Sequence, residues 1–208
     1  MRFRRGKSRA TRWTSSARRC ATDYLVFEHI HLYTYDLFAE RVGIKLVWGC
    51  LAWYAYFYCV GLWFVADLPN PGAPAWLLVL SAGIFVAGWV LSRGANMQKH
   101  AFKRDPGRPF LGRFLPTAIS DGEHTLLCGG FWGVSRHVNY LGEILMAGGL
   151  TLSLGRPSEF GPWLYPIYYV VILSLRERDD DRRCAAKYGA LWLRYRERVP
   201  WQIVPRVY

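Results

Sequence analysis

The sequence lacks the cysteine arrangements that small secreted proteins and zinc-binding domains use. Its five cysteines are an odd number and include no CxxC pair, so we expect neither a disulfide framework nor a metal site. The motifs G-x-G-x-x-G, G-x-x-x-x-G-K-[ST], H-E-x-x-H and G-x-S-x-G are also missing. Their absence argues against soluble-type cofactor sites and against the common hydrolases.

Long stretches of the chain also lack charge, although 52% of the 208 residues are hydrophobic and 16% are aromatic. Residues 47–66, 75–91 and 163–175 contain no charged side chain. Crossing a hydrocarbon core takes roughly 20 apolar residues in a helix, and the backbone there must satisfy its own hydrogen bonds. We therefore predict membrane-spanning helices in these segments, with Pro166 bending or beginning the last one. Residues 138–154 form a shorter, glycine-rich apolar piece.

Acidic residues are absent from the first 20 positions, which carry many arginines and no apolar signal-peptide core. We interpret residues 1–22 as a disordered basic arm at a membrane surface, with an organellar transit peptide as the alternative. Residues 23–46 mix charges with aromatics and predict an amphipathic or interfacial helix. The net charge of +12 comes largely from basic blocks beside apolar segments, which favours anionic lipid over a specific nucleic-acid partner.

The distribution of charge also predicts an orientation. The polar segment at 92–114, which we interpret as a loop, is rich in lysine and arginine, and so is the charged segment from 176 to the last residue. Basic loops favour the cytoplasmic face. The patterns together predict an all-α fold, a polytopic transmembrane helical bundle that forms one membrane-embedded domain over residues 23–208.

Three polar clusters beside the apolar segments are candidates for chemistry. One is a line of residues spaced by four, which share a face if the segment is helical: Arg176, Asp180, Cys184 and Tyr188. A second follows the 75–91 segment: Asn96, Gln98, Lys99, Lys103 and Arg104. A third interrupts apolar sequence: Trp132, Arg136, His137, Asn139 and Tyr140. Cationic side chains of this kind bind phosphate, and an aromatic side chain such as Trp132 can stack on a planar ring of a ligand. The alternatives are a solvated helix face, a cationic loop and an interfacial Arg–His pair.

The segments NMQKHAFKR, GFWGVSRHVNYLGE and RERDDDRRCAAKYGALWLRYRERVPWQIVPRVY resemble the C-terminal motifs of the sterol reductases. That family includes Δ14-, Δ7- and C24(28)-sterol reductases and the sterol-reductase domain of lamin B receptor. The resemblance is clear over about residues 94–208. It implies a membrane-embedded helical bundle, in the endoplasmic reticulum of eukaryotes, whose C-terminal half binds NADPH in a pocket on the cytoplasmic side.

The resemblance assigns cofactor binding residue by residue to the three clusters. The positions so assigned are Lys99, Lys103, Arg104, Trp132, Arg136, His137, Asn139, Tyr140, Arg176, Asp180, Cys184 and Tyr188. Two of the motif positions depart from the family's usual residue: Lys103 is more often arginine, and Glu143 more often aspartate.

The resemblance also implies a reaction, the reduction of a sterol carbon–carbon double bond by protonation and then hydride transfer from NADPH in an apolar pocket. Trp53 and Tyr58 match a second family pattern, and Tyr58 is the candidate acid. Departures occur nearby: Cys50 replaces an aspartate and Ala55 replaces a proline of the family pattern. The sterol-binding half is therefore less well matched than the cofactor half.

Other functions remain open at this point. Isoprenylcysteine carboxyl methyltransferases, which use S-adenosylmethionine, share an Arg-His motif and a charged C-terminal helix, but they normally have Arg-His-Pro and a Glu-Glu pair. Val138 follows His137 here, and residues 179–181 are all aspartate. Steroid 5α-reductases share a similar layout. A catalytically inactive sterol-binding relative, or a fragment, is the non-enzymatic alternative.

Overall fold

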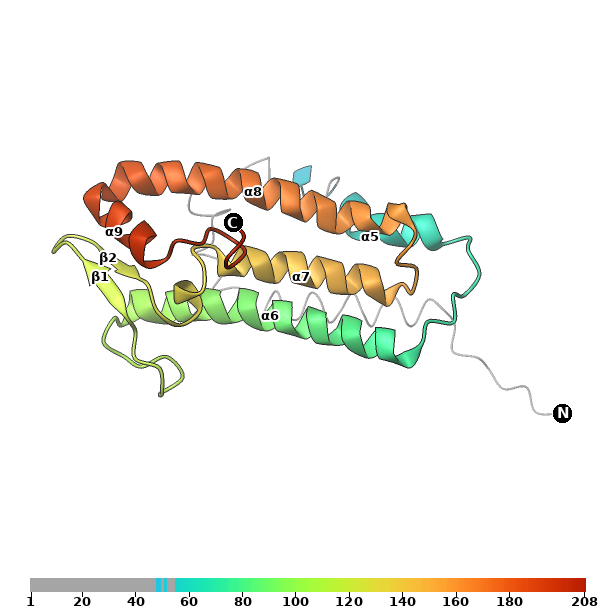
Figure 1. Cartoon of the computed structure of the whole chain (residues 1–208), viewed down its shortest axis with the longest axis horizontal. Helices are drawn as coiled ribbons and strands as arrows, with labels where there is room; N and C mark the ends of the chain where they lie inside the picture. The colour runs from blue at the N-terminus through green and yellow to red at the C-terminus, as the bar shows by residue number, and fades with distance from the viewer. Residues whose placement is uncertain (1–47, 50, 52–54) are drawn as a thin grey trace. The chain divides into compact units, whose positions relative to one another are not determined.

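The computed structural model describes residues 48, 49, 51 and 55–208. The predicted basic arm at 1–22, the predicted interfacial helix at 23–46 and Trp53 lie outside the described residues. The helices and strands in chain order are α5 (Ala55–Val65), α6 (Ala75–Arg104), β1 (Ala118–Ser120), β2 (Thr125–Leu127), the 3-10 turn η2 (Gly130–Gly133), α7 (Val138–Ser153), α8 (Phe160–Tyr188) and α9 (Ala190–Arg198) (Figure 1). The described part of the chain is therefore mostly helical, as predicted.

Helix α6 extends well past its apolar half. It begins after Pro74 and runs for 30 residues to Arg104, so the prediction of a loop from residue 92 was wrong. Residues 95–99 are Ala, Asn, Met, Gln and Lys, most of which favour helix, and the helix ends just before Pro106 because the residue preceding a proline avoids the helical conformation. Among the described residues, α6 is the one helix long and apolar enough to cross a membrane.

Helices α6 and α7 approach each other closely at glycines. A Cβ placed on Gly88 would lie 2.6 Å from the carbonyl oxygen of Gly142, and one on Gly142 would lie 2.5 Å from the backbone nitrogen of Ser92. Small residues let two helix backbones pack side by side where a larger side chain would separate them. Gly142 and Gly149 of the 138–154 segment are thus explained by this interface (Figure 1), whereas an added Cβ on Gly148 would have no atom within 4 Å.

Helix α8 runs without a break from an apolar half into a charged half. It begins at Phe160 and is 29 residues long, with Pro166 inside it, so Pro166 does not begin the helix. Its apolar half packs against α5 and α7, where Val60, Ala147 and Tyr165 form a buried cluster. The residues spaced by four, Arg176, Asp180, Cys184 and Tyr188, therefore lie on the same continuous helix as the apolar residues that pack against α5 and α7.

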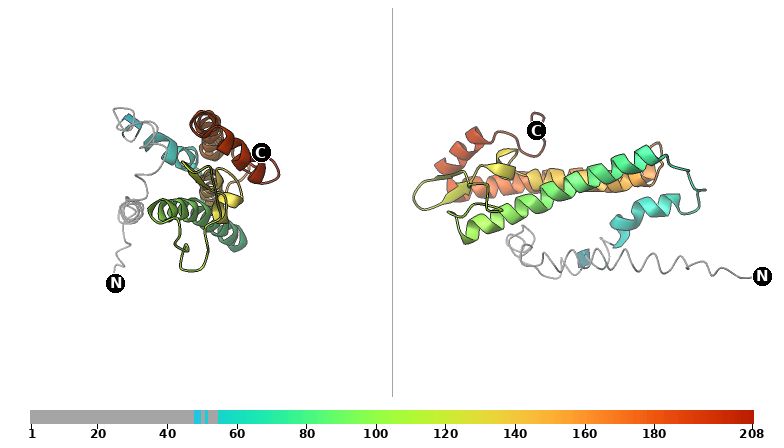
Figure 2. Two further views of the ribbon diagram at one scale, coloured as in Figure 1. Left: turned by 90° about the vertical axis from the view of Figure 1, so that its left-hand side faces the viewer. Right: turned by 90° about the horizontal axis from the view of Figure 1, so that it is seen from below.

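The segment between α6 and α7 contains a short β-hairpin that the sequence analysis did not predict. Strands β1 and β2 are antiparallel, with Ile119 paired with Leu126. At the tip, Oδ1 of Asp121 accepts hydrogen bonds from the backbone nitrogens of Glu123 and His124. Ile119 and Leu126 pack against a buried cluster that includes Trp192 and Tyr195 of α9. Figure 2 shows the hairpin and α9 at the same end of the helices.

The C-terminal tail crosses back to the start of α7. The backbone nitrogens of Arg136 and His137 donate to the carbonyl oxygens of Trp201 and Gln202 at 2.9 and 2.8 Å. Ile203 is 2% exposed and packs against Tyr140 and Leu173. The tail therefore fixes the backbone at Arg136 and His137, and it also packs against α8 through Ile203 and Leu173.

Candidate functional site

The three polar clusters predicted from the sequence meet in one region. Lys99 of α6 places its Nζ 5.1 Å from the centre of the Trp132 ring. His137, at the start of α7, places Nε2 3.9 Å from Oδ2 of Asp180 on α8. The charge of Lys99 acts on the pKa values of both His137 and Asp180. Residues far apart in the sequence thus surround a single site.

Gln98 and Trp132 hold the loop before α7 against α6. The indole Nε1 of Trp132 donates to the carbonyl oxygen of Ala95 at 2.8 Å. Oε1 of Gln98 accepts from the backbone nitrogen of Phe131 at 3.0 Å, and its Nε2 donates to the carbonyl oxygen of Gly129 at 3.3 Å. Gln98 is only 4% exposed, so its amide is occupied by the protein backbone. The site's aromatic ring is therefore fixed in position by helix α6.

Arg136 is buried and bound to the tail. Its Nη1 donates to the carbonyl oxygens of Val199 and Pro200 at 3.2 and 3.1 Å, and its Nη2 lies 3.9 Å from Oδ1 of Asp181. Burial lowers the pKa of Arg136 from its ordinary value, an effect that the charge of Asp181 partly opposes. A charged guanidinium in this setting positions the tail and the adjacent imidazole. Cofactor contact by Arg136, as the family resemblance implies, stays a prediction.

His137 is a buried imidazole held neutral. Its ring stacks on Tyr140 with centroids 4.9 Å apart. Burial, followed by the charges of Lys99 and Arg136, lowers its pKa to about 3. Burial also raises the pKa of Asp180 above its ordinary range, and the positive charge of Lys99 partly opposes this. His137 is therefore uncharged near neutral pH, and its contact with Asp180 is a polar contact and not a salt bridge.

Several buried polar atoms around the start of α7 have no hydrogen-bond partner among the described residues. They include Nε2 of His137 and Oδ1 of Asn139 at the site, and Oε1 of Glu177 and of Gln202 behind it. A buried polar atom without a partner costs free energy of about 1–3 kcal/mol. Their grouping marks the start of α7 as a place where a polar ligand or water would be bound.

The line of residues spaced by four lies on one continuous helix, α8, so its members share a face of that helix. Arg176, Asp180, Cys184 and Tyr188 are each half-buried. The ring of Tyr188 stacks on Trp192 with centroids 6.4 Å apart and meets the edge of His124 at 5.2 Å. Burial, with the nearby charge of Asp180, raises the pKa of the Cys184 thiol to about 12. The thiol is therefore protonated at neutral pH and is not a nucleophile.

Two residues of this region were missed in the sequence analysis. Glu177 is completely buried, and its Oε2 accepts a hydrogen bond from the hydroxyl of Tyr208 at 3.4 Å. A signal for it existed, because Glu177 continues the spacing of four set by Tyr169 and Leu173 on the inward face. His124 contacts Tyr188 from the hairpin, and nothing in the sequence pattern linked those two positions.

The candidate acid, Tyr58, lies apart from this cluster. It is on α5, and its hydroxyl lies 3.0 Å from the hydroxyl of Tyr169 on α8, within hydrogen-bond distance. Tyr169 precedes Arg176 by seven positions, about 10 Å along a helix. Tyr58 is 51% exposed. The hydroxyl pair and the polar cluster are therefore two separate features along one helix.

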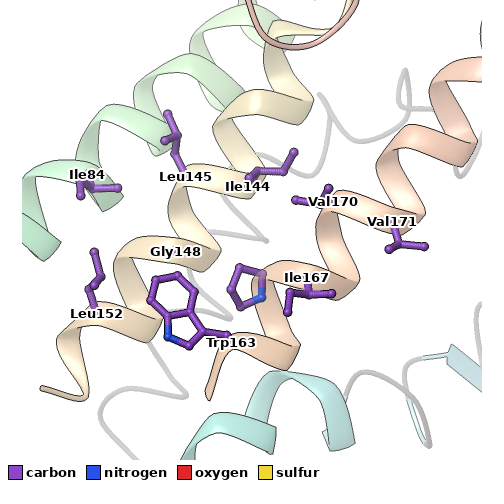
Figure 3. Close-up of a pocket in the computed structure, with 10 residues that line it drawn as sticks. Ile84, Ile144, Leu145, Gly148, Leu152, Trp163, Ile167, Val170 and Val171 are labelled. Atoms are coloured by element: carbon purple, nitrogen blue, oxygen red, sulfur yellow. The ribbon is translucent and has the colours of Figure 1, made fainter. Parts of the chain in front are cut away.

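A cavity of about 480 Å³ lies between α6, α7 and α8, and it is lined by apolar side chains alone (Figure 3). The residues that line it are Ile84, Ile144, Leu145, Gly148, Leu152, Trp163, Pro166, Ile167, Val170 and Val171. On α8, Trp163, Ile167 and Val171 lie about 120–160° around the helix from Tyr165 and Tyr169, because 100° separates successive residues of a helix. The cavity therefore opens mainly away from the Tyr58–Tyr169 pair.

Comparison with known proteins gives a consistent result. Residues 20–208 match the model of the family described as "Ergosterol biosynthesis ERG4/ERG24 family". The chain is 40% identical to a Delta(14)-sterol reductase of Arabidopsis thaliana, covering 89% of this chain and 49% of that protein. It is 37% identical to a Delta(14)-sterol reductase of Methylotuvimicrobium alcaliphilum, covering 89% and 43%.

It is also 36% identical to the Delta(14)-sterol reductase LBR of Gallus gallus, covering 86% of this chain and 28% of that protein. The chain thus spans about half the length, or less, of these curated relatives. The matched region includes all three polar clusters. The chain belongs to the Ergosterol biosynthesis ERG4/ERG24 family.

Proposed function

We propose that this chain binds NADPH and takes part in the reduction of a sterol carbon–carbon double bond. The Δ14 bond is favoured over Δ7, because the relatives compared above carry the name Delta(14)-sterol reductase. The observation that carries the proposal is the meeting of the three clusters, with His137 3.9 Å from Asp180 and Lys99 5.1 Å from the Trp132 ring.

The residues at the site fit a phosphorylated dinucleotide. Lys99, Lys103, Arg104 and Arg176 would bind its phosphates, since ionised hydrogen bonds to phosphate are among the strongest. The unsatisfied Oδ1 of Asn139 and Nε2 of His137 could bond its amide and hydroxyl groups. Trp132 offers a ring whose position is already fixed by Ala95. The predicted set is completed by Arg136, Tyr140, Asp180, Cys184 and Tyr188.

The bound cofactor would supply the hydride. An isolated alkene accepts hydride poorly until it is protonated, so the protein must provide an acid in an environment without water. The hydroxyls of Tyr58 and Tyr169, 3.0 Å apart, are the groups we assign to that role. The rings of Tyr165 and Tyr169 lie nearby, and aromatic faces stabilise a passing cation.

We further propose a multi-pass membrane location with the polar cluster on the cytoplasmic side. The apolar half of α6, α5 and the apolar half of α8 would lie in the bilayer, and the basic residues after them would face the cytoplasm. In a eukaryote this membrane would be the endoplasmic reticulum. Sterol and membrane lipid are the partners that this proposal requires.

The first experiment titrates the full chain in detergent with NADPH and, in parallel, with S-adenosylmethionine. Binding is measured by isothermal titration calorimetry. We expect NADPH to bind, and Arg176→Ala and Tyr188→Phe each to weaken binding. Arg113→Ala, which removes an exposed arginine outside the predicted set of cofactor-binding residues, is the matched control. Binding of S-adenosylmethionine instead, or NADPH affinity unchanged in both site variants, contradicts the proposed cofactor site.

The second experiment tests the reaction itself. The chain is expressed in yeast that lacks its own Δ14-sterol reductase, and the membrane sterols are analysed. Loss of the accumulated Δ14 sterol supports catalysis. An unchanged sterol profile with the protein present in membranes and NADPH binding intact supports the non-enzymatic alternative.

A further inference from the structure

The connection from α6 to β1 carries an exposed apolar surface that the proposed reaction does not use. Residues 105–116 leave α6, the helix long and apolar enough to cross a membrane, at its basic end (Figure 1). Large apolar side chains project from this loop: Leu111 is 72% exposed, Phe114 55% and Leu115 75%. Exposed apolar side chains gathered in this way mark an interaction surface more often than chance.

The backbone holds the tip of this loop in a defined shape. Phe110 and Phe114 exchange two backbone hydrogen bonds, of 2.8 and 3.0 Å, and the nitrogen of Gly112 donates to the carbonyl oxygen of Pro109 at 3.2 Å. Leu111 has a φ of 53°, a left-handed conformation that large side chains rarely adopt. The chain therefore keeps a leucine at an unfavourable backbone angle and also exposes it to the surroundings. An apolar environment would remove the cost of that exposure.

Positive charge lies beside the apolar side chains. Arg108 and Arg113 are both exposed, and Arg113 lies between Leu111 and Phe114 in the sequence. The acid of this loop is Asp105, whose Oδ1 accepts a hydrogen bond from the nitrogen of Gly107 at 3.2 Å. A partner that fits must therefore present anionic groups next to apolar ones.

The headgroup region of a bilayer has this chemistry, because lipid phosphates lie directly above the acyl chains. The loop also follows directly on the basic end of α6, the candidate membrane helix, where Lys103 and Arg104 add to the positive charge. We propose that residues 105–116 are an interfacial anchor for anionic phospholipid. Leu111, Phe114 and Leu115 enter the acyl boundary, and Arg108 and Arg113 bind the phosphates above it. The anchor fixes the depth at which the polar end of α6 leaves the membrane.

The test uses the full chain with its five native cysteines replaced by serine, reconstituted in nanodiscs. A single cysteine at Leu111→Cys carries a fluorophore whose emission shifts to the blue in an apolar environment. Glu123→Cys, at the exposed tip of the β-hairpin, carries the same fluorophore as the matched control. Each protein is measured in phosphatidylcholine alone and in a mixture with phosphatidylserine, with an aqueous quencher added.

The expected result is a blue shift and protection from the quencher at position 111, stronger in the mixture, with neither effect at position 123. Adding Arg108→Gln or Arg113→Gln should each weaken the preference for the anionic membrane about fivefold. Equal quenching at positions 111 and 123 overturns the proposal. So does protection at position 111 that is independent of lipid charge but rises with protein density, since this would indicate contact between copies of the chain. Neither outcome bears on NADPH binding.

Discussion

The imidazole Nε2 of His137 lies 3.9 Å from the carboxylate Oδ2 of Asp180, which connects the start of α7 to the charged half of α8. The two residues come from different motifs, and the imidazole side chain is only 6% exposed. A ring in this setting is a neutral hydrogen-bonding group beside an acid. The contact joins two of the predicted clusters, and the lowered pKa of the imidazole makes the stability of the fold depend on pH.

Acid should destabilise the protein through His137. Its pKa falls from an ordinary 6.5 to about 3 in the folded chain, so the unfolded chain binds the proton more readily. The free energy of unfolding that the neutral imidazole of His137 contributes is fully present above about pH 6.5, and it is lost as the pH falls toward about 3. Asp180 and Glu177, whose pKa values are raised by burial, act in the opposite direction over the acid range. The difference between wild type and His137→Gln therefore isolates the imidazole.

This is measured by thermal unfolding in detergent at a series of pH values, followed by circular dichroism. We expect the melting temperature of wild type to fall more steeply with acid than that of His137→Gln. His124→Gln, at the half-exposed imidazole of the hairpin, is the control and should leave the slope unchanged. Equal slopes for wild type and His137→Gln would show that the imidazole is not held neutral by the fold.

Gly130 should be needed for the loop that positions Trp132. It has a φ of 65°, and a Cβ there would lie 2.2 Å from Nε2 of Gln98. Gly130→Ala therefore strains the backbone and displaces an amide that binds two backbone groups, with an expected loss of about 2–4 kcal/mol in the free energy of unfolding. Gly112→Ala is the control, because Gly112 has a φ of 68° but no atom within 4 Å of an added Cβ. Gly130→Ala should lose more free energy of unfolding than Gly112→Ala. Equal losses would show that the contact between residue 130 and Gln98 does not contribute.

The sequence predicted the helices correctly where a long uncharged or glycine-rich apolar run marks them. The uncharged run at 75–91 lies within α6, and the glycine-rich piece at 138–154 covers the whole of α7, Val138–Ser153. Their far ends were not predictable from charge, because a helix that leaves the hydrocarbon core can continue beyond it with polar residues. The helical segment up to Arg104 and the continuation of α8 to Tyr188 are both of this kind.

The site was predictable as a list of residues and not as an arrangement. Spacing by four placed Arg176 and Asp180 on one face of a helix, but no local pattern says that His137 meets that face. The backbone role of Gln98 and the tail contacts of Arg136 depend on Gly129, Val199 and other distant partners. The short β-hairpin was missed because three-residue strands are too brief for an alternating pattern to be recognised.

The α6–α7 interface should not tolerate a methyl group. Gly142→Ala would bring a Cβ within 2.5 Å of the backbone nitrogen of Ser92, and a helix must move to relieve such a contact. We expect a loss of about 1–3 kcal/mol in the free energy of unfolding. Gly83→Ala, also in a helix but with no atom within 4 Å, should be neutral or stabilising by up to about 1 kcal/mol. Equal effects would mean that glycine at position 142 serves flexibility and not packing.

The proposed acid pair should separate catalysis from cofactor binding. Tyr58→Phe and Tyr169→Phe each remove one hydroxyl of the pair that lies 3.0 Å apart and leave the rings in place. If NADPH binds at the polar cluster, both variants should keep its affinity and lose sterol reduction in the yeast assay by roughly 10²-fold or more. Reduction that survives in both variants would remove these hydroxyls from the mechanism.

Arg136 and Arg176 should differ in how salt affects NADPH binding. Arg136 binds the carbonyl oxygens of Val199 and Pro200, so we expect its effect on the proposed NADPH binding to come through the position of the tail and His137. Arg136→Lys cannot make both bonds, because lysine lacks the planar fork, and should cost about 1–3 kcal/mol of stability. It should also weaken NADPH binding without changing the dependence of affinity on salt.

Arg176→Ala should instead weaken NADPH binding and reduce its dependence on salt, since a cation that contacts phosphate is screened by ions in solution. Affinity measured for both variants at low and high salt distinguishes the two roles. A reduced salt dependence in Arg136→Lys would mean that this guanidinium contacts the phosphates directly. The backbone bonds to Val199 and Pro200 would then have to break when the cofactor binds, and the tail would move with it.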